Sequence, residues 1–193
     1  MTADSPRLDK KLDDLYDLID GIEVAMLTTR RRDGRLVSRA MQTQRRTAGT
    51  DLWFVTSIES AKFEELAFDP QVNVAYFRDR TKEWVSVSGR AILSQDRDLI
   101  HGLYKPDWRI WFGDEGGRYD GSADDPRLAL VLVEAESVVY FKKDKSAPLV
   151  LFELAKAMIT RQPAELGADR TLDANELRAA AQRSQAGEGD LRS

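Results

Sequence analysis

One arginine occupies a strand position with apolar neighbours, and a bound anion would explain it. Residues 36–41 alternate between two faces as a β-strand does, and Arg39 shares its face with the apolar Val37 and Met41. A guanidinium keeps its charge, so in such a neighbourhood it favours an anion close by. In the alternative interpretation, Arg39 extends its charged end into water, as arginine often does.

A lysine lies in the first turn of a helix predicted over residues 61–68, where the helix dipole disfavours a positive charge. Ser60 has the position of an N-cap, so Lys62 falls in the first turn, at the positive end of the helix dipole. A phosphate suits the free backbone amides of a helix N-terminus and would attract Lys62 as well. The pattern therefore predicts a phosphate site, unless Lys62 is simply solvated. The hydroxyls that could assist are those of Thr56, Ser57 and Ser60.

The composition narrows the class of protein. The 193 residues are 42% hydrophobic and 32% charged, which suits a soluble protein of one domain with appendages. A net charge of -4 argues against nucleic acid or an anionic membrane as the main partner. The absence of cysteine excludes disulfides and thiolate metal sites, and the single histidine leaves little metal chemistry. Because residues 1–6 lack the apolar core of a signal peptide, we expect cytoplasmic residence.

The elements around these residues are mainly strands. A first helix is predicted over residues 6–19, with Asp14 and its neighbouring aspartates facing away from the core. A second helix, over residues 61–68, is expected to bury Phe63, Leu66 and Ala67. About six mainly antiparallel strands with no βαβ alternation favour a closed or nearly closed barrel. The predicted strands are 23–29, 36–44, 52–56, 72–77, 84–93, and 128–141 as one strand or a pair.

The remaining segments carry fewer signals. After a predicted helix over residues 95–104, the glycine-rich stretch 106–121 is long and irregular, which is common in functional loops. Beyond it we expect a helix over residues 148–160, and a capping box of Asp173 and Glu176 that starts another short helix. The domain prediction is a barrel over residues 1–141, a helical extension over 142–183 and a disordered tail over 184–193.

Several segments follow one another in the order of a known family. They are residues 34–41, 52–57, 60–62, 69–76, 85–91, 111–113, 125–126 and 128–141. In this order they resemble the pyridoxamine 5'-phosphate oxidase-like, FMN-binding split barrels, and the general stress protein 26 branch fits best. The resemblance implies a six-stranded split barrel that forms a homodimer, with FMN, or alternatively FAD, bound between the subunits.

The resemblance also implies roles for single residues. Arg39 and Lys62 would hold the phosphate, assisted by hydroxyls, while a stretch of the second strand would run beside the flavin ring. Trp111 would cover the ring from the other subunit, unless it packs into a core or an interface as most aromatic residues do. The expected cofactor-binding residues are Arg39, Ala40, Met41, Gln42, Val55, Thr56, Ser57, Ser60, Lys62 and Trp111.

Three aromatic residues and the histidine have less specific interpretations. Trp108 and Trp111 are three residues apart, so a helical turn would place them on one face, and Phe112 follows directly. His101 is expected on the surface, with no partner that would tune its pKa.

Pyridoxamine 5'-phosphate oxidases end in an arginine and histidine pair that grips the substrate, whereas this chain ends in an acidic, alanine-rich extension. Oxidation of vitamin B6 is therefore not expected.

Three functions remain open on the sequence. The first is a flavin-dependent oxidoreductase that passes electrons between FMN and an unidentified small acceptor. The second is a protein that binds, stores or senses flavin under stress without turnover. The third is a split barrel with another ligand, such as a deazaflavin or haem, for which Arg39 and Lys62 give less reason.

Overall fold

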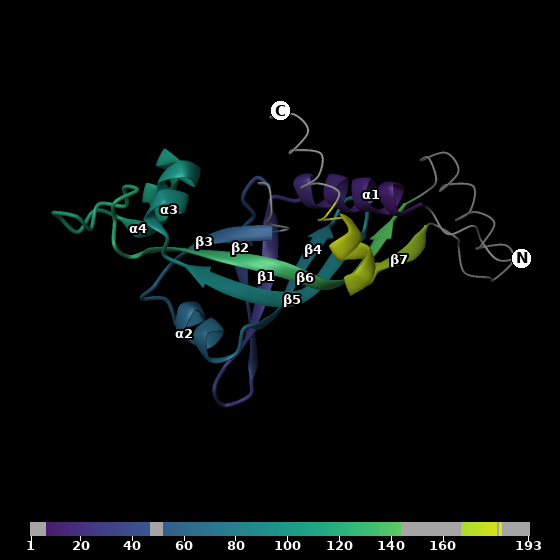
Figure 1. Cartoon of the computed structure of the whole chain (residues 1–193), viewed down its shortest axis with the longest axis horizontal. Coiled ribbons are helices and arrows are strands. Elements are labelled where there is room, and N and C mark those ends of the chain that lie inside the picture. The colour runs from purple at the N-terminus through teal and green to yellow at the C-terminus, as the bar shows by residue number, and fades with distance from the viewer. Residues whose placement is uncertain (1–6, 47–51, 144–166, 181, 183–193) are drawn as a thin grey trace, which may run out of the picture.

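The computed structural model describes residues 7–46, 52–143, 167–180 and 182 (Figure 1). Helices α3 and α4 lie at one end of the long strands β5 and β6, and helix α1 and strand β7 lie toward the other end. In chain order the elements are α1 (Leu8–Asp20), β1 (Val24–Arg30), β2 (Leu36–Gln42), β3 (Leu52–Ser57), α2 (Ala61–Phe68), β4 (Gln71–Arg78), β5 (Glu83–Ser94), α3 (Arg97–Leu103), the 3-10 helix η1 (Pro106–Trp108), α4 (Arg109–Phe112), β6 (Leu128–Lys142) and β7 (Ala168–Leu172).

The strands form one antiparallel sheet in the order β2-β1-β4-β5-β6-β3, with β7 added beside β6. The two ends of this order approach each other just beyond β2, where the Gln44 amide donates to the carbonyl of Trp53 at 3.1 Å. Because this contact brings β3 back toward β2, the sheet curls into a nearly closed barrel. The mainly-β barrel predicted from the sequence is confirmed, and residues 128–142 form one strand.

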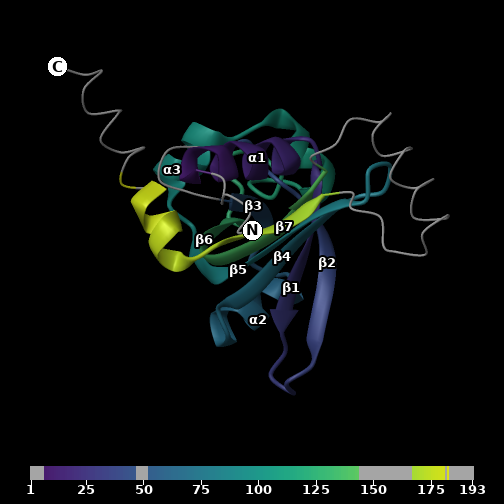
Figure 2. The ribbon, with the colours of Figure 1, turned by 90° about the vertical axis from the view of Figure 1, so that its right-hand side faces the viewer.

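The hairpin of β1 and β2 projects from the rest of the molecule (Figure 2). Its turn contains Gly34 at φ 83°, a left-handed conformation that favours glycine. The register places Arg39 opposite Leu27, which is 1% exposed. Arg39 therefore lies on the inward face of β2, as its alternation with Val37 and Met41 predicted.

Helix α1 packs against the main core through Leu15, Leu18 and Ile19, all buried. One aspartate of this helix corrects the prediction that its acidic residues point away. Asp14 accepts a hydrogen bond from Lys142 Nζ at 2.6 Å and forms an ion pair with Arg170. Burial acts to raise the pKa of Asp14, but Lys142 and Arg170 together lower it below its usual range. Since these partners belong to β6 and β7, Asp14 fastens the helix to the sheet.

The sequence prediction missed β7, which lies inside the segment assigned to a helical extension. Residues 168–172 pair with residues 138–142 of β6, so this part of the extension belongs to the sheet. The capping box after it is confirmed, because the Asp173 amide donates to Glu176 Oε2 at 3.1 Å and the Glu176 amide to Asp173 Oδ1 at 2.9 Å. The predicted helix over 148–160, the tail over 184–193 and residues 1–6 lie outside the described residues.

Candidate functional site

A cavity of about 530 Å³ lies between β2, β3, the start of α2 and the η1–α4 segment. Its volume falls within the usual range for small-molecule sites. Every cofactor-binding residue predicted from the sequence lines it, and so do Val24, Gln44, Trp108 and Phe112. Val24 and Gln44 were missed, because their place depends on the strand register that brings Val24 opposite Gln42. Segments far apart in sequence thus meet where the sequence prediction placed one site.

Arg39 has a protein anion beside it, which the sequence did not reveal. Its Nη1 donates to Glu65 Oε2 at 2.7 Å and its Nη2 to Glu65 Oε1 at 2.9 Å, a bidentate pair. The hydroxyl of Thr29 accepts from Nη1 at 2.9 Å and donates to Glu65 Oε2 at 2.6 Å. The prediction that Arg39 needs a nearby anion is therefore met, in part, by Glu65.

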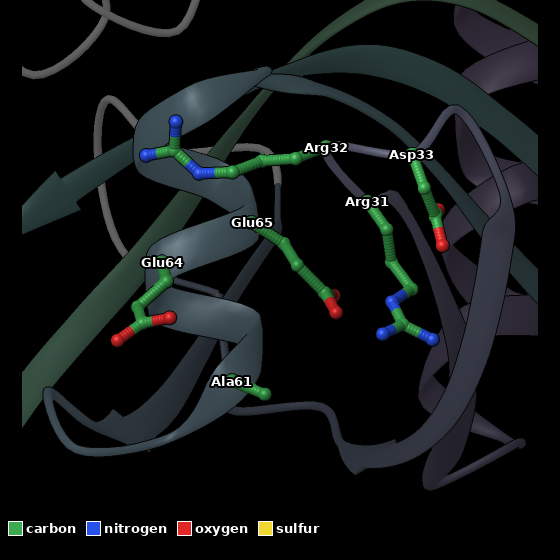
Figure 3. A pocket seen from close by; sticks show the side chains of 6 residues that line it. All are labelled: Arg31, Arg32, Asp33, Ala61, Glu64 and Glu65. Carbon is green, nitrogen blue, oxygen red and sulfur yellow. The ribbon is translucent and has the colours of Figure 1, made fainter.

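The burial of Glu65 corrects the expected inner face of α2. Leu66 is buried as predicted, but Ala67 is exposed and the carboxylate of Glu65 is turned inward instead. Figure 3 shows Glu65 extending from α2 toward the hairpin, with Arg31 extending beside it, in a second cavity of about 290 Å³. Hydrogen bonds from Arg39 hold the pKa of Glu65 below its usual range, although burial opposes this. Glu65 is thus a charged carboxylate at neutral pH.

Lys62 lines the larger cavity together with Arg39, so two cations lie close together there. Burial lowers the pKa of Lys62 and the charge of Arg39 lowers it further, while Glu65 acts in the opposite direction. Two cations that line one cavity, only partly compensated by one carboxylate, leave a net positive end. An oxyanion would relieve this repulsion, so the residues present fit a phosphate group.

The hydroxyl residues lie between β3 and α2, next to these cations. Ser60 is the N-cap residue of α2 as predicted, but its hydroxyl donates to the Ser57 carbonyl at 2.7 Å and makes no capping bond. The hydroxyls of Thr56 and Ser60 lie 3.1 Å apart. The Ser57 hydroxyl accepts from the Glu59 amide at 3.1 Å. This connected set of hydroxyls can turn its donors toward an anion in the cavity.

Aromatic residues of the η1–α4 segment line the cavity, and two of them differ strongly in burial. Trp108 is 2% exposed and packs edge-on against Trp53, with ring centroids 6.1 Å apart, whereas Trp111 is 74% exposed. Both tryptophans line the cavity, as expected of residues on one face, but Trp108 ends the 3-10 helix η1 and enters the core while Trp111 lies on α4 at the surface. Trp108 Nε1 is buried and has no hydrogen-bond acceptor among the described residues.

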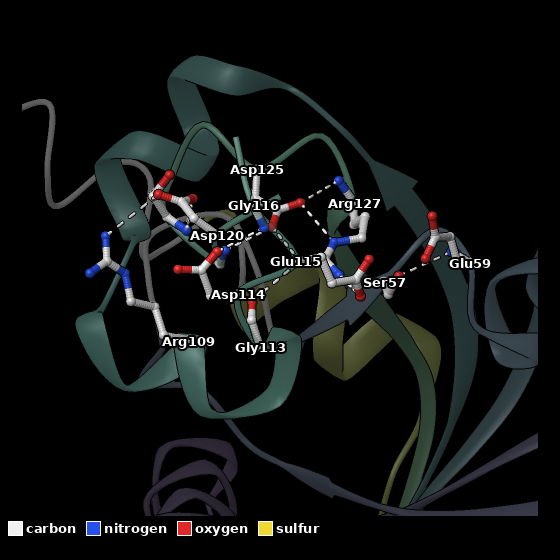
Figure 4. A network of polar contacts seen from close by, with 12 residues as sticks. Ser57, Glu59, Arg109, Gly113, Asp114, Glu115, Gly116, Asp120, Asp125 and Arg127 are labelled. Carbon is white, nitrogen blue, oxygen red and sulfur yellow. Dashed lines mark hydrogen bonds and ion pairs between the residues drawn. The ribbon is translucent and has the colours of Figure 1, made fainter. Parts of the chain in front are cut away.

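A polar network holds the loop that follows this wall (Figure 4). Arg127, which is 4% exposed, donates through Nη2 to Asp125 Oδ2 at 2.7 Å, and the Gly121 amide donates to the same oxygen at 2.8 Å. Burial acts to raise the pKa of Asp125, but these hydrogen bonds lower it. The guanidinium of Arg127 also lies 5.9 Å from the ring centroid of Phe112. The network thereby anchors the loop next to a residue that lines the cavity.

The single histidine lies away from the larger cavity. His101 is on the surface as predicted, but Asp124 Oδ1 lies 2.9 Å from its Nε2, so it does have a partner. No histidine and no carboxylate is among the described residues that line the larger cavity. In the described part of the chain, no helix is long and apolar enough to cross a membrane.

Known proteins resemble this chain in sequence and in fold. The family model described as "Pyridoxamine 5'-phosphate oxidase like" matches residues 10–165. Protein bli-3 of Neurospora crassa is 34% identical over 173 residues, which cover 88% of this chain and 83% of that protein.

Two solved structures share the fold. A structure described as a general stress protein 26 from Jannaschia sp. CCS1 superposes with a TM-score of 0.65 at 21% identity, over 86% of this chain and 99% of its own. A pyridoxamine 5'-phosphate oxidase-related, FMN-binding protein from Nostoc punctiforme PCC 73102 has a TM-score of 0.52 at 18% identity, over 70% of this chain and 81% of its own. At these identities the likeness concerns the fold.

Proposed function

The chain belongs to the pyridoxamine 5'-phosphate oxidase-like family, and we propose that it binds FMN in the larger cavity and passes electrons between FMN and a small acceptor. One observation carries the proposal: the residues expected to bind the cofactor line a single cavity, and they include two cations and an aromatic ring. The FMN-binding description of the Nostoc protein supports the same cofactor. A role under stress is part of the proposal, and it rests on the general stress protein name of the Jannaschia structure. Cytoplasmic residence is proposed as well, from the sequence expectation.

In this proposal the phosphate is held by Arg39 and Lys62, with hydroxyls of the β3–α2 segment as further donors. Strand β2 pairs only with β1 among the described strands, so residues 40–42 have no neighbouring strand along their other edge. Backbone amides and carbonyls of this edge can therefore orient a flavin ring. FMN, when bound, supplies the redox chemistry, and the protein supplies binding, orientation and exclusion of water.

We also propose that the chain forms a homodimer that covers this cavity. Val24 and Met26 are 52% and 43% exposed, and Met26 lies opposite both Ala40 and Ala75 in the sheet. The largely exposed Phe77 extends the same outer face along β4. Because Val24 both belongs to this apolar face and lines the cavity, a second subunit placed there would close part of the site.

A second candidate function is flavin binding without turnover. It is favoured by one observation: among the described residues that line the cavity there is no carboxylate or histidine that could act as a general acid or base. Such a protein would store or sense FMN, and the same phosphate site would serve it.

The experiment has two steps. The purified protein is first titrated with FMN, and we expect a perturbed visible flavin spectrum. The bound FMN is then reduced chemically without oxygen, and its reoxidation by quinones, nitro compounds and oxygen is compared with that of free reduced FMN. At least one acceptor should react faster with the bound form. If every acceptor reacts faster with free reduced FMN, the oxidoreductase function is refuted and the binding function remains.

A further inference from the structure

We infer that Glu65 is a positioning residue of the phosphate site, whose carboxylate holds the guanidinium of Arg39 with one edge turned to the ligand. This inference rests on the proposed function, because it concerns the same cavity. Glu65 itself does not line that cavity; it lines the smaller one on the hairpin side of α2. It would therefore act on the ligand through Arg39.

The hydrogen bonds of Arg39 show which edge of its guanidinium has no acceptor in the described part of the chain. Glu65 accepts from Nη1 and Nη2 at the end of the guanidinium, and Thr29 accepts from the remaining N–H of Nη1. The N–H of Nε and the outer N–H of Nη2 lie side by side on the other edge, and the structure gives them no acceptor among the described residues. This edge has the fork geometry that binds two oxygens of a phosphate.

The position of the Glu65 carboxylate is itself fixed. Its side chain is 11% exposed and receives the short bond from the Thr29 hydroxyl in addition to the pair from Arg39. Arg31 of the hairpin adds a further positive charge beside it. In contrast, the side chain of Arg39 is 27% exposed, at the border of the cavity. The buried carboxylate can thus restrict a cation that would otherwise have considerable rotamer freedom.

Charge and position make opposite predictions for removal of Glu65. If only charge matters, loss of the carboxylate makes the cavity more positive and phosphate should bind more tightly. If position matters, Arg39 loses its fixed orientation and phosphate should bind more weakly. We expect position to prevail, because the Arg39 guanidinium binds the carboxylate directly and Glu65 lies outside the cavity that the ligand would occupy.

The test compares FMN with riboflavin, which differ by the phosphate alone. In Glu65→Gln, which keeps the side-chain shape, the ratio of riboflavin Kd to FMN Kd should fall about tenfold, while riboflavin affinity stays unchanged. The matched control is Glu64→Gln, an exposed neighbour on the same helix, which should leave the ratio as it is. Thr29→Val removes the hydroxyl that joins Glu65 to Arg39 and should lower the ratio in the same direction, so it replaces Glu65→Gln if that variant does not fold.

A double variant shows whether Glu65 acts through Arg39. In the Arg39→Gln protein, the further change Glu65→Gln should no longer lower the ratio. A ratio that is unchanged or higher in Glu65→Gln alone, or lowered equally with and without Arg39, would overturn the positioning role. The proposed function fails separately, if the unaltered protein shows no preference for FMN over riboflavin.

Discussion

Replacement of Lys62 by methionine tests the phosphate site with little change in shape. Methionine keeps an unbranched side chain of good helix propensity in α2, and it removes the ammonium group with its charge and its N–H donors. A hydrogen bond to a charged group is worth about 1.5–3 kcal/mol. Since about 1.4 kcal/mol corresponds to tenfold in Kd, we expect the Kd for FMN to rise about 10- to 150-fold.

Riboflavin affinity and thermal stability of Lys62→Met serve as two controls for this prediction. Riboflavin has no phosphate, so its Kd should change little in Lys62→Met. The pKa of Lys62 is lowered by burial and by Arg39, so removal of its charge relieves repulsion in the free protein, and thermal stability should not fall.

The assay is titration calorimetry, or quenching of flavin fluorescence, at fixed ionic strength. Lys10→Met, an exposed lysine of α1, is the matched control and should bind FMN as the unaltered protein does. Equal losses of FMN and riboflavin affinity would show that the variant damages the fold or the ring site. Unchanged FMN affinity would refute the assignment of Lys62 to the phosphate.

Three further predictions concern pH and assembly. The pKa of Lys62 is lowered in the free protein, and a bound phosphate would raise it. FMN affinity should therefore be full while Lys62 is charged in the free protein, and it should fall as alkaline pH rises through the pKa of Lys62. FMN titrations across that pH range should show no such fall in Lys62→Met. The pKa values of Glu65 and Asp14 are lowered in the folded state, so the stabilisation that these carboxylates give is complete above about pH 4 and is lost as pH falls through their folded-state pKa values. Thermal melts of Glu65→Gln should therefore show a weaker dependence on acid pH. Met26→Lys places a charge on the apolar outer face and should raise the dimer dissociation constant at least about tenfold in sedimentation, whereas Leu99→Lys on α3 should not.

Residues that line the larger cavity could be predicted because local rules fix the direction of their side chains. Strand alternation turns Arg39 inward with Met41, and the N-cap position of Ser60 puts Lys62 in the first turn of α2. The cavity then collects these residues from separate elements, as the family resemblance implied.

Other features depend on tertiary contacts that no local pattern contains. A glutamate on a short helix is ordinarily exposed, and only the approach of the hairpin with Arg39 and Thr29 makes burial of Glu65 favourable. Strand β7 has a mostly polar sequence, and it forms because it pairs with residues 138–142 of β6. Similarly, Trp108 lies deeper than Trp111 because its ring fills a core cluster with Trp53.

The most direct measurement is a paired titration of the unaltered protein with FMN and with riboflavin. A site built from Arg39 and Lys62 predicts saturable binding of FMN with a shifted visible spectrum, and a Kd for riboflavin at least about tenfold higher than the Kd for FMN. Equal affinities for the two flavins, or no heat and no spectral change with FMN, would contradict the phosphate site on which the proposed function depends.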